Sequence, residues 1–350
     1  MTNILIDSDK KLHNLLSKIE DCKEIGLDTE FIRESTYRPI LALIQISLAN
    51  EEIYLIDPQK IKDISGISKI TSDPQIIKII HSAKQDLEAL YSHLGSYPKN
   101  VFDTQIAYNF LSEKSNIGYS ALVKNICDVD IKEGSWRTDW LKRPLSEEKK
   151  EYAANDVRYL IKIKNQLEKN LKRINRYSWF QEEQNNELEK SNIIIEPDNA
   201  WEKINYPLYF DSSDLALLKK LASWREKLSI KYDIPKRWIL SDSLLIKVMI
   251  TNEHKAQEII ENIKQTLTSS EKDILQKILS SKRKIKNKNL YPKKDIEQKC
   301  NEVLSYVSDE FKIDPTIIAN KRDMEMFIIL NQKARFMKGW RYQIFGKLVQ

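Results

Sequence analysis

The sequence predicts an α/β domain, built as a mixed β-sheet flanked by helices, followed by all-α helical bundle domains. Short apolar runs typical of β-strands alternate with helical patterns over residues 1–110, and the pattern is helical from Ser146 onward. Prolines then interrupt the chain near residue 205, and apolar residues beyond that point recur at helical spacing. A chain of 350 residues also suits two or three cores better than one.

Five candidate strands lie before residue 110. Three of them follow one another through short connections and should form an antiparallel meander: residues 24–28, 41–47 and 52–56. The other two alternate with helical patterns and should join the same sheet in parallel through crossovers: strands 76–80 and 100–102, with helices 83–91 and 104–111. Together these elements predict a mixed sheet.

The helical part begins at Ser146, which can cap a helix that has two acidic residues in its first turn. This helix is predicted to run without interruption through residues 152–170. Residues 193–207 contain two prolines and are interpreted as a linker. Beyond this linker, Asp211 or Ser212 can cap the next helix.

These patterns divide the chain into three predicted units. An α/β domain with its linker helices occupies residues 1–205, a helical domain residues 206–285, and a second helical domain residues 286–350. Seven basic residues and no acidic one lie between Ser281 and Asp295. This tract is a linker between two bundles, a phosphate-contacting arm, or both.

Charge is distributed unevenly along the chain. Residues 201–350 carry 29 Lys and Arg against 19 Asp and Glu, whereas residues 1–200 have a net charge of −4 within a total of +6. A basic excess gathered in one region favours a polyanionic partner. A well-solvated surface explains the same charge equally well.

The composition, 41% hydrophobic and 31% charged, is typical of a folded globular protein. The longest apolar runs, such as residues 40–44, are far shorter than the roughly 20 residues that cross a membrane, so we expect no transmembrane segment. The first twenty residues alternate apolar and charged positions, unlike a secretory signal. Three widely spaced cysteines without metal-binding spacing favour a reducing, cytoplasmic location.

Two acidic residues stand close together on the first predicted strand. Asp28 and Glu30 are two residues apart, so both carboxylates project from the same face of the strand. They repel one another unless a cation lies between them, and Mg²⁺ or Mn²⁺ suits such oxygen ligands. The alternative is an exposed strand end without function.

Two further sites carry carboxylates. Asp86 follows the predicted strand 76–80 at the start of a helix, a position where sheets of this kind bind ligands and where helix-capping residues also occur. Tyr152 and Asp156 are four residues apart on a helix and share one face. One of them can therefore bind a metal while the other positions a water molecule, although each motif alone is compatible with a plain helix surface.

Three other polar residues are interpreted structurally. Asp103 follows an apolar strand and should cap the next helix, with a role near the substrate as the alternative. Asp57 precedes a proline and is interpreted as a turn residue. His81 is expected to be packed or hydrogen bonded rather than a metal ligand.

The order and spacing of these acids are far more specific than any one of them. D-x-E on an early strand, an Asp after a later strand and Tyr-x-x-x-Asp on a helix form the pattern of the DEDD exonucleases of the tyrosine subclass. The chain resembles the ribonuclease D family over nearly its whole length. The resemblance rests on these segments in that family's order: LDTEF, PILALIQIS, YLIDP, HSAKQDLEAL, FDTQIA, SWRTDWLKRPLS and EYAANDVRYL.

Some parts of the chain match this family less closely. Residues 211–280 look like the family's helicase-and-RNase-D C-terminal (HRDC) domain, and residues 296–350 look like a diverged second copy. Many DEDD enzymes carry an asparagine around the third acid, where this chain has residues 81–85 with the sequence HSAKQ. This departure bears on substrate contacts there, not on the carboxylate.

The resemblance implies a ribonuclease H-like catalytic fold with two divalent metal ions, Mg²⁺ or Mn²⁺. By analogy Asp28 would bridge both ions, with Glu30 and Asp156 completing one site. Asp86 would support the other, mainly through water. Because a phenol with a pKa of about 10 is a poor base at neutral pH, Tyr152 is expected to orient a metal-activated water.

The resemblance also implies an activity and a partner. The expected reaction is hydrolysis of RNA from the 3′ end with release of nucleoside 5′-monophosphates, by a monomer whose helical domains guide structured RNA such as tRNA precursors. Recognition of the terminal hydroxyl would involve Thr29, Glu30 and Phe31, although Phe31 is equally compatible with a place in the core. Lys236 and Arg237 would contact phosphates.

Two alternatives stay open at this point. A 3′-to-5′ DNA exonuclease would use the same carboxylates, because sugar choice depends on contacts to the 2′-hydroxyl that no motif locates. A catalytically inactive RNA-binding protein could retain the fold. The complete set of four acids and Tyr152 argues against the inactive protein.

Overall fold

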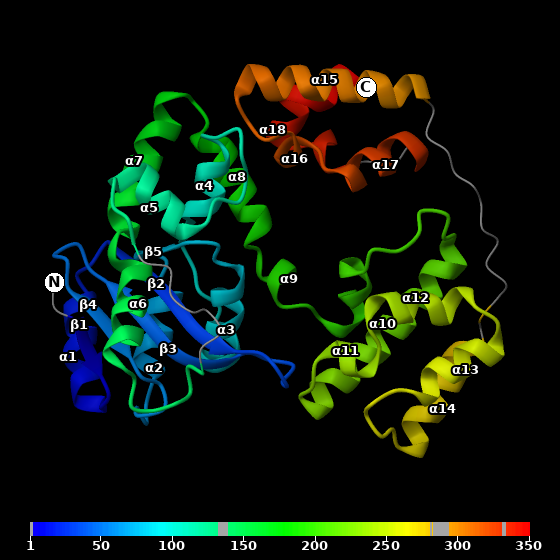
Figure 1. The fold of residues 1–350 in the computed structure, drawn as a ribbon, viewed down its shortest axis with the longest axis horizontal. Helices are drawn as coiled ribbons and strands as arrows, with labels where there is room; N and C mark the ends of the chain where they lie inside the picture. The colour runs from blue at the N-terminus through cyan, green and yellow to red at the C-terminus, as the bar shows by residue number, and fades with distance from the viewer. Residues whose placement is uncertain (1–2, 132–138, 281, 283–293, 331–333) are drawn as a thin grey trace.

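The computed structural model describes residues 3–131, 139–280, 282, 294–330 and 334–350 (Figure 1). Most of the basic tract between Ser281 and Asp295, and the beginning of the SWRTDWLKRPLS segment, lie outside the described residues. Among the described helices, none is long and apolar enough to cross a membrane.

Six strands form one mixed sheet in the order β1-β4-β3-β2-β5-β6. Their bounds are β1 Asn3–Ile6, β2 Glu24–Ile32, β3 Ile40–Ser47, β4 Ile53–Ile56, β5 Ile77–Ile80 and β6 Val101–Asp103. The pairs β2–β3 and β3–β4 are antiparallel and β2–β5 and β5–β6 are parallel, which confirms the predicted mixed sheet. The prediction missed β1, a four-residue strand parallel to β4, because so short a run shows no clear periodicity.

Helices cover both faces of the sheet, as Figure 1 shows. One face carries α1 Asp9–Ile19, α2 Ser65–Ser72 and α3 Lys84–Leu94. The other carries α4 Thr104–Asn109, α5 Tyr119–Cys127, α6 Glu147–Arg158, α7 Leu160–Arg173 and α8 Tyr177–Glu187. The central strand β3 is therefore buried on both sides, with Leu43 in one core and Ile44 in the other.

The helix predicted to run through residues 152–170 is in fact broken at Tyr159, which separates α6 from α7. The hydroxyl of Ser47 donates to the carbonyl oxygen of Val157 at 2.8 Å. The amide of Tyr159 donates to the hydroxyl of Tyr119 at 3.3 Å as well as to the carbonyl oxygen of Val157. Tertiary hydrogen bonds from Ser47 and Tyr119 thus reach the chain at the break, and local periodicity does not reveal such bonds.

The next helices have a core of their own. They are η1 Pro197–Lys203, α10 Ser212–Tyr232, α11 Lys236–Ile239, α12 Asp242–Ile250, α13 Glu253–Glu261 and α14 Ser269–Leu279. The short helix before them, α9 Lys190–Ile193, packs against α3 of the α/β domain. Asp211 caps α10 in a reciprocal capping box with Asp214, as predicted for the cap. The segment interpreted as a linker is partly ordered against α10, because Ala200 and Ile204 are buried in this core.

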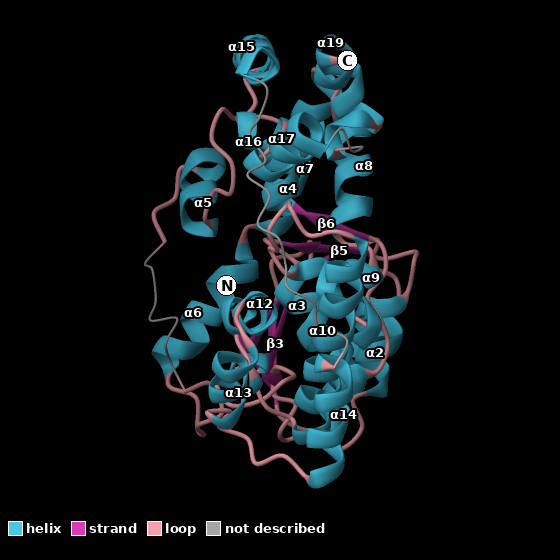
Figure 2. Ribbon diagram, turned by 90° about the vertical axis from the view of Figure 1, so that its right-hand side faces the viewer, coloured by secondary structure: helices cyan, strands magenta, loops and turns pink. Residues whose placement is uncertain are grey.

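The last helices pack onto the α/β domain. They are α15 Lys294–Phe311, α16 Pro315–Ile318, α17 Lys321–Leu330, η2 Arg335–Met337, α18 Gly339–Arg341, η3 Tyr342–Gly346 and α19 Lys347–Val349. Figure 2 shows them next to the end of the domain that carries α4, α7 and α8. Trp340 contacts Phe110 and stacks on Trp179, with ring centroids 5.0 and 5.5 Å apart, and Arg341 pairs with buried Glu183. Their buried side chains thus continue the core of the α/β domain.

Candidate active site

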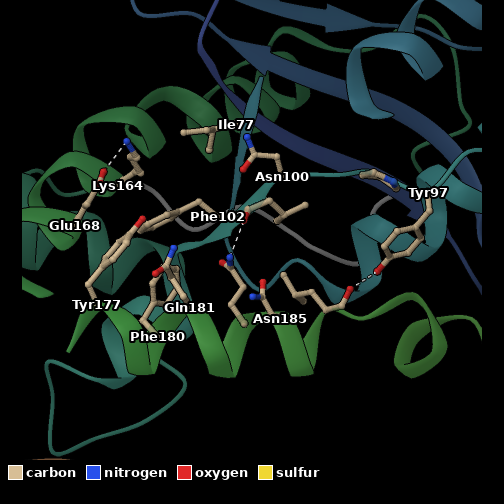
Figure 3. Close-up of a pocket in the computed structure, with 14 residues that line it drawn as sticks. Ile77, Tyr97, Asn100, Phe102, Lys164, Glu168, Tyr177, Phe180, Gln181 and Asn185 are labelled. Carbon is tan, nitrogen blue, oxygen red and sulfur yellow. Dashed lines mark hydrogen bonds and ion pairs between the residues drawn. The ribbon is translucent and has the colours of Figure 1, made fainter. Parts of the chain in front are cut away.

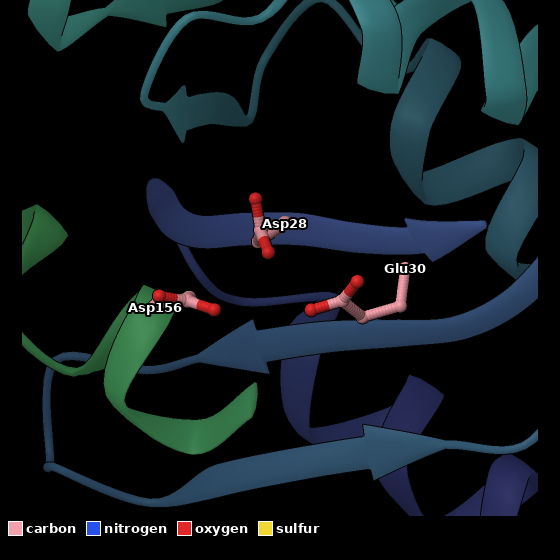
Figure 4. A group of neighbouring side chains, drawn as sticks. All are labelled: Asp28, Glu30 and Asp156. Carbon is pink, nitrogen blue, oxygen red and sulfur yellow. The ribbon is translucent and has the colours of Figure 1, made fainter. Parts of the chain in front are cut away.

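Three carboxylates converge where α6 crosses β2. Asp28 and Glu30 project from one face of β2, and Asp156 reaches them from α6 (Figure 4). One oxygen from each lies within 4.8 Å of the others. The helix approaches the sheet closely through small and β-branched residues, since Ala153 and Val157 are fully buried. The structure therefore brings together three of the four predicted acids as possible ligands of one ion.

The fourth acid, Asp86, lies in the first turn of α3 and is buried beside the others. β5 pairs with β2 only from Glu24 to Gly26, so the next part of that edge of β2 is open to α3. Asp86 Oδ1 accepts hydrogen bonds from the amide of Thr29 at 3.1 Å and from its hydroxyl at 2.6 Å. Asp86 is thus anchored to β2 but is not one of the three carboxylates that share the 4.8 Å group.

The electrostatics of this cluster are unfavourable to four negative charges. Burial, followed by Asp86, Asp156 and Glu30, raises the pKa of Asp28 well above its usual range. Burial and neighbouring acids raise the pKa of Glu30 to about 9. Burial is also the main cause that raises the pKa values of Asp86 and Asp156 to about 7, against the opposing hydrogen bonds of Thr29 and Tyr152.

This donor set fits a divalent cation. A cation among the carboxylates would offset both their burial and their mutual repulsion. All of the donors are carboxylate oxygens, which are hard ligands that suit Mg²⁺ or Mn²⁺ rather than softer metals.

Tyr152 stands next to this cluster on α6. Its hydroxyl lies close enough to the carboxylate of Asp156 to lower the pKa of that carboxyl. Burial, followed by the charges of Asp156, Glu30 and Asp28, raises the pKa of Tyr152 above its ordinary value. The phenol is therefore protonated at neutral pH, which makes it a hydrogen-bonding and orienting group rather than a base.

The ring of Tyr152 packs against Trp140, a residue that was not predicted to be part of the site. Trp140 lies 5.9 Å from it between ring centroids and is itself buried. Arg143 holds this segment, because its guanidinium donates to the carbonyl oxygens of Trp140 and Ala42 and to both carboxylate oxygens of Asp57.

Asp57 makes the predicted turn and has a further partner in Arg143. This residue does make a turn, since Oδ1 accepts from the amide of Gln59, but it also forms a buried ion pair with Arg143. The two residues are 86 positions apart, and no motif in the sequence relates them. Only the packing of the chain could show this bond.

The structural interpretations of Asp103 and His81 are confirmed. Asp103 caps α4, because its carboxylate accepts from the amides of Gln105 and Ile106. The same carboxylate accepts from the amides of Ser82 and Ala83 in the turn before α3. His81 is hydrogen bonded to Thr104 and to the carbonyl oxygen of Ile117. Both residues fix the turn that leads into α3, and so they support Asp86 indirectly.

Thr29 and Phe31, the predicted substrate-binding residues, flank Glu30 on β2. Thr29 is buried, and its hydroxyl and amide both donate to Asp86. Phe31 is half-buried, lies at a β-bulge after Glu30 and packs against the core on the α3 side. Their contacts with a substrate stay a prediction.

A separate pocket, drawn in Figure 3, contains none of the predicted site residues. It has a volume of about 290 Å³ and lies between the beginnings of β5 and β6 and the helices α7 and α8. Several of its polar groups are engaged in the fold, since Gln184 donates to the carbonyl oxygen of Val101 and Lys164 pairs with Glu168. The acidic cluster, rather than this pocket, is therefore the candidate active site.

Comparisons with known proteins agree with this assignment. A family model described as 3′-5′ exonuclease matches residues 3–172, and the HRDC domain model matches residues 214–260. The ribonuclease D of Desulfotalea psychrophila is 30% identical over 97% of this chain and 98% of its own length. The ribonuclease D of Haemophilus influenzae is 32% identical over 93% of this chain and 86% of its own length.

A solved structure shows the same arrangement over the whole chain. The structure of Escherichia coli RNase D, described as an exoribonuclease involved in structured RNA processing, superposes with a TM-score of 0.81 and 26% identity. It covers 100% of this chain and 98% of the E. coli chain. The chain has an exonuclease domain and an HRDC domain, and relatives named ribonuclease D match it over nearly their full length. It therefore belongs to the ribonuclease D family of 3′-to-5′ exoribonucleases.

Proposed function

We propose that this protein trims the 3′ ends of tRNA precursors and releases nucleoside 5′-monophosphates by a two-metal mechanism. The observation that carries the mechanism is the convergence of Asp28, Glu30 and Asp156, with Asp86 and Tyr152 beside them. Four acids in mutual repulsion, Asp86 buried and the other three partly buried, are unfavourable in a fold unless cations bind there.

Two divalent ions would be held by these acids. Asp28, Glu30 and Asp156 would hold one ion, and Asp86, whose charge acts on Asp28, would support the other. When bound, such ions stabilise the attacking and the leaving oxygen of an in-line phosphoryl displacement. The negative carboxylates would bind the cations, and the cations would contact the phosphates of the substrate. This explains why the α/β domain is acidic although the substrate is a polyanion.

Tyr152 has a separate task. Its protonated hydroxyl lies beside the carboxylate of Asp156, so it is placed to orient a water molecule there. Trp140 restrains the ring, and Arg143 restrains the segment that carries Trp140. The chain thus positions the nucleophile, a task for which a phenol that stays protonated is suited.

Structured RNA is the proposed substrate because of the helical region. The E. coli relative is described as acting in structured RNA processing, and the basic excess of this chain lies in residues 201–350. Arg237 is exposed at the start of α11 and is available to a phosphate, whereas the charge of Lys236 is partly offset by Glu226. Arg237 also donates to the carbonyl oxygen of Glu34 at 3.4 Å, which brings it close to the loop after β2.

The test uses RNA and DNA oligonucleotides of the same sequence, labelled at the 5′ end, with Mg²⁺ or Mn²⁺. We expect a descending ladder from the RNA, 5′-monophosphates as product, and no reaction in EDTA. Asp28→Asn should abolish the ladder, and Asp21→Asn, which changes an exposed acid of the same domain, should leave it intact. A ladder from DNA alone, or one that persists in EDTA, would refute the proposal.

The substrate class needs a different test. Deleting residues 206–350 would remove Trp340 and Arg341, which pack against the α/β domain. A loss of activity could then come from poorer folding as well as from lost substrate guidance. Arg237→Ala leaves the core intact and should weaken trimming of a tRNA precursor more than trimming of a short single strand. Equal effects on both substrates would argue against guidance by this surface.

A further inference from the structure

Gln45, in the middle of β3, is a buried amide without a partner. Its exposed fraction is 0%, and neither its oxygen nor its nitrogen has a hydrogen bond anywhere in the described part of the chain. An amide buried in this way has given up its hydrogen bonds to water without replacing them, which is unfavourable. Such groups are rare in folded proteins, and each calls for an explanation.

The position of Gln45 in the sheet offers an explanation for its unpaired amide. In the antiparallel pairing of β2 and β3, Gln45 lies directly opposite Asp28, and Leu43 lies opposite Glu30. Residues opposite one another in such a pair point to the same face, with Cβ atoms roughly 4.5 to 5.5 Å apart. The amide of Gln45 is therefore a direct neighbour of the carboxylate of Asp28.

The helix that carries Asp156 covers this face. Ser47, two residues after Gln45 and on the same face, donates to the carbonyl oxygen of Val157, which follows Asp156. On its other side Gln45 is opposite Leu55 of β4, an apolar residue. Of the two residues opposite Gln45 in the ladders, Asp28 and Leu55, only Asp28 has a side chain that can accept a hydrogen bond from an amide.

We infer that Gln45 is a positioning residue whose amide nitrogen donates to Asp28 and holds that carboxylate in the orientation the metal ions require. This inference rests on the proposed function. The two side chains need only a change of rotamer to meet, because they already face one another across the ladder. An apolar residue of the same size would fill the space without any unpaired group, so the amide is explained by its neighbour rather than by packing.

The test compares Gln45→Met, which keeps the length of the side chain without its amide, with the unchanged protein. Gln45→Leu serves as a second apolar variant, and Gln75→Met, at an exposed position, is the control. Thermal unfolding is followed in EDTA and during titration with Mn²⁺, and kcat and KM are measured on RNA. These readouts separate metal binding from folding and from turnover.

We expect the metal-free Gln45→Met protein to unfold at the same temperature as the unchanged protein or at a higher one, because a buried amide whose oxygen has no partner is replaced by an apolar chain of the same length. Its apparent Mn²⁺ affinity should fall roughly 10- to 100-fold, as is usual when a residue that orients a ligand is lost. kcat should fall with KM nearly unchanged, and Gln45→Leu should share the metal defect.

Two results would overturn the inference. One is an unchanged Mn²⁺ affinity, and the other is an equal loss of stability with and without metal, since either means that Gln45 acts only in the fold. If the unchanged protein itself shows no Mn²⁺-dependent stabilisation and no RNA hydrolysis, the proposed function fails instead. The failures of the two ideas are therefore distinguishable.

Discussion

Replacing Asp156 with asparagine should stabilise the metal-free protein and abolish its response to metal. Burial and the neighbouring acid Asp86 raise the pKa of Asp156 from 3.8 to about 7 in the folded protein. A carboxyl with a raised pKa favours folding when it is protonated, so its contribution is lost as the pH rises through about 7. The amide of asparagine has nearly the same shape as the carboxyl but does not ionise, so the variant does not lose stability as the pH rises.

The magnitude follows from the two pKa values. At pH 8, the difference between 3.8 and about 7 corresponds to roughly 4 kcal/mol of unfavourable free energy. Relaxation of the site and counter-ions reduce this figure, so we expect the variant to gain about 2 to 4 kcal/mol in free energy of unfolding. For a domain of this size that is a rise in Tm of roughly 5 to 15 °C.

The assay is thermal unfolding in EDTA at pH 8 and pH 5, repeated with excess Mn²⁺. At pH 5 the carboxyl is protonated in the folded state, so the advantage of the variant should shrink to roughly 1.5 kcal/mol. Mn²⁺ at a hundred times its Kd should add about 2.7 kcal/mol to the unchanged protein and nearly nothing to Asp156→Asn. Asp21→Asn, at an exposed position, controls for the loss of one charge.

Two outcomes would refute this reasoning. The first is a variant that is less stable than the unchanged protein at pH 8 without metal. The second is a gain that does not shrink at pH 5, because a gain without pH dependence does not come from the ionisation of Asp156. Either result would mean that the carboxylates do not repel one another as their burial and spacing indicate.

Three further substitutions test the parts around the cluster. Tyr152→Phe should lower kcat about 100-fold while the Mn²⁺-dependent rise in Tm persists, because all four carboxylates remain; a lost rise would make Tyr152 part of the metal site. Arg143→Met leaves Asp57 buried without its partner and should cost roughly 3 to 5 kcal/mol in urea unfolding, and a cost below about 1 kcal/mol would contradict the buried pair. Trp340→Ala should cost about 3 to 5 kcal/mol and make the last helices susceptible to limited proteolysis, whereas resistance equal to that of the unchanged protein would show that this packing is dispensable.

Much of the architecture was predictable because it depends on local periodicity. Apolar runs and alternation located five of the six strands, and cap residues located the beginnings of helices, as at Ser146. The two-residue spacing of Asp28 and Glu30 and the four-residue spacing of Tyr152 and Asp156 likewise depend only on strand and helix geometry. These spacings do not predict that the two motifs meet where α6 crosses β2.

The tertiary structure decided the contacts between residues far apart in the chain. Pairs such as Asp57 with Arg143 and Glu183 with Arg341 join segments that share no periodic pattern, so the sequence alone names no partner. The break at Tyr159 has the same origin, because Ser47 and Tyr119 bond to this part of the chain from other elements. The burial of Gln45 opposite Asp28 also depends on strand pairing that its own position in the sequence does not reveal. Periodicity reports which residues are buried; which groups they meet there is set by the packing of the whole chain.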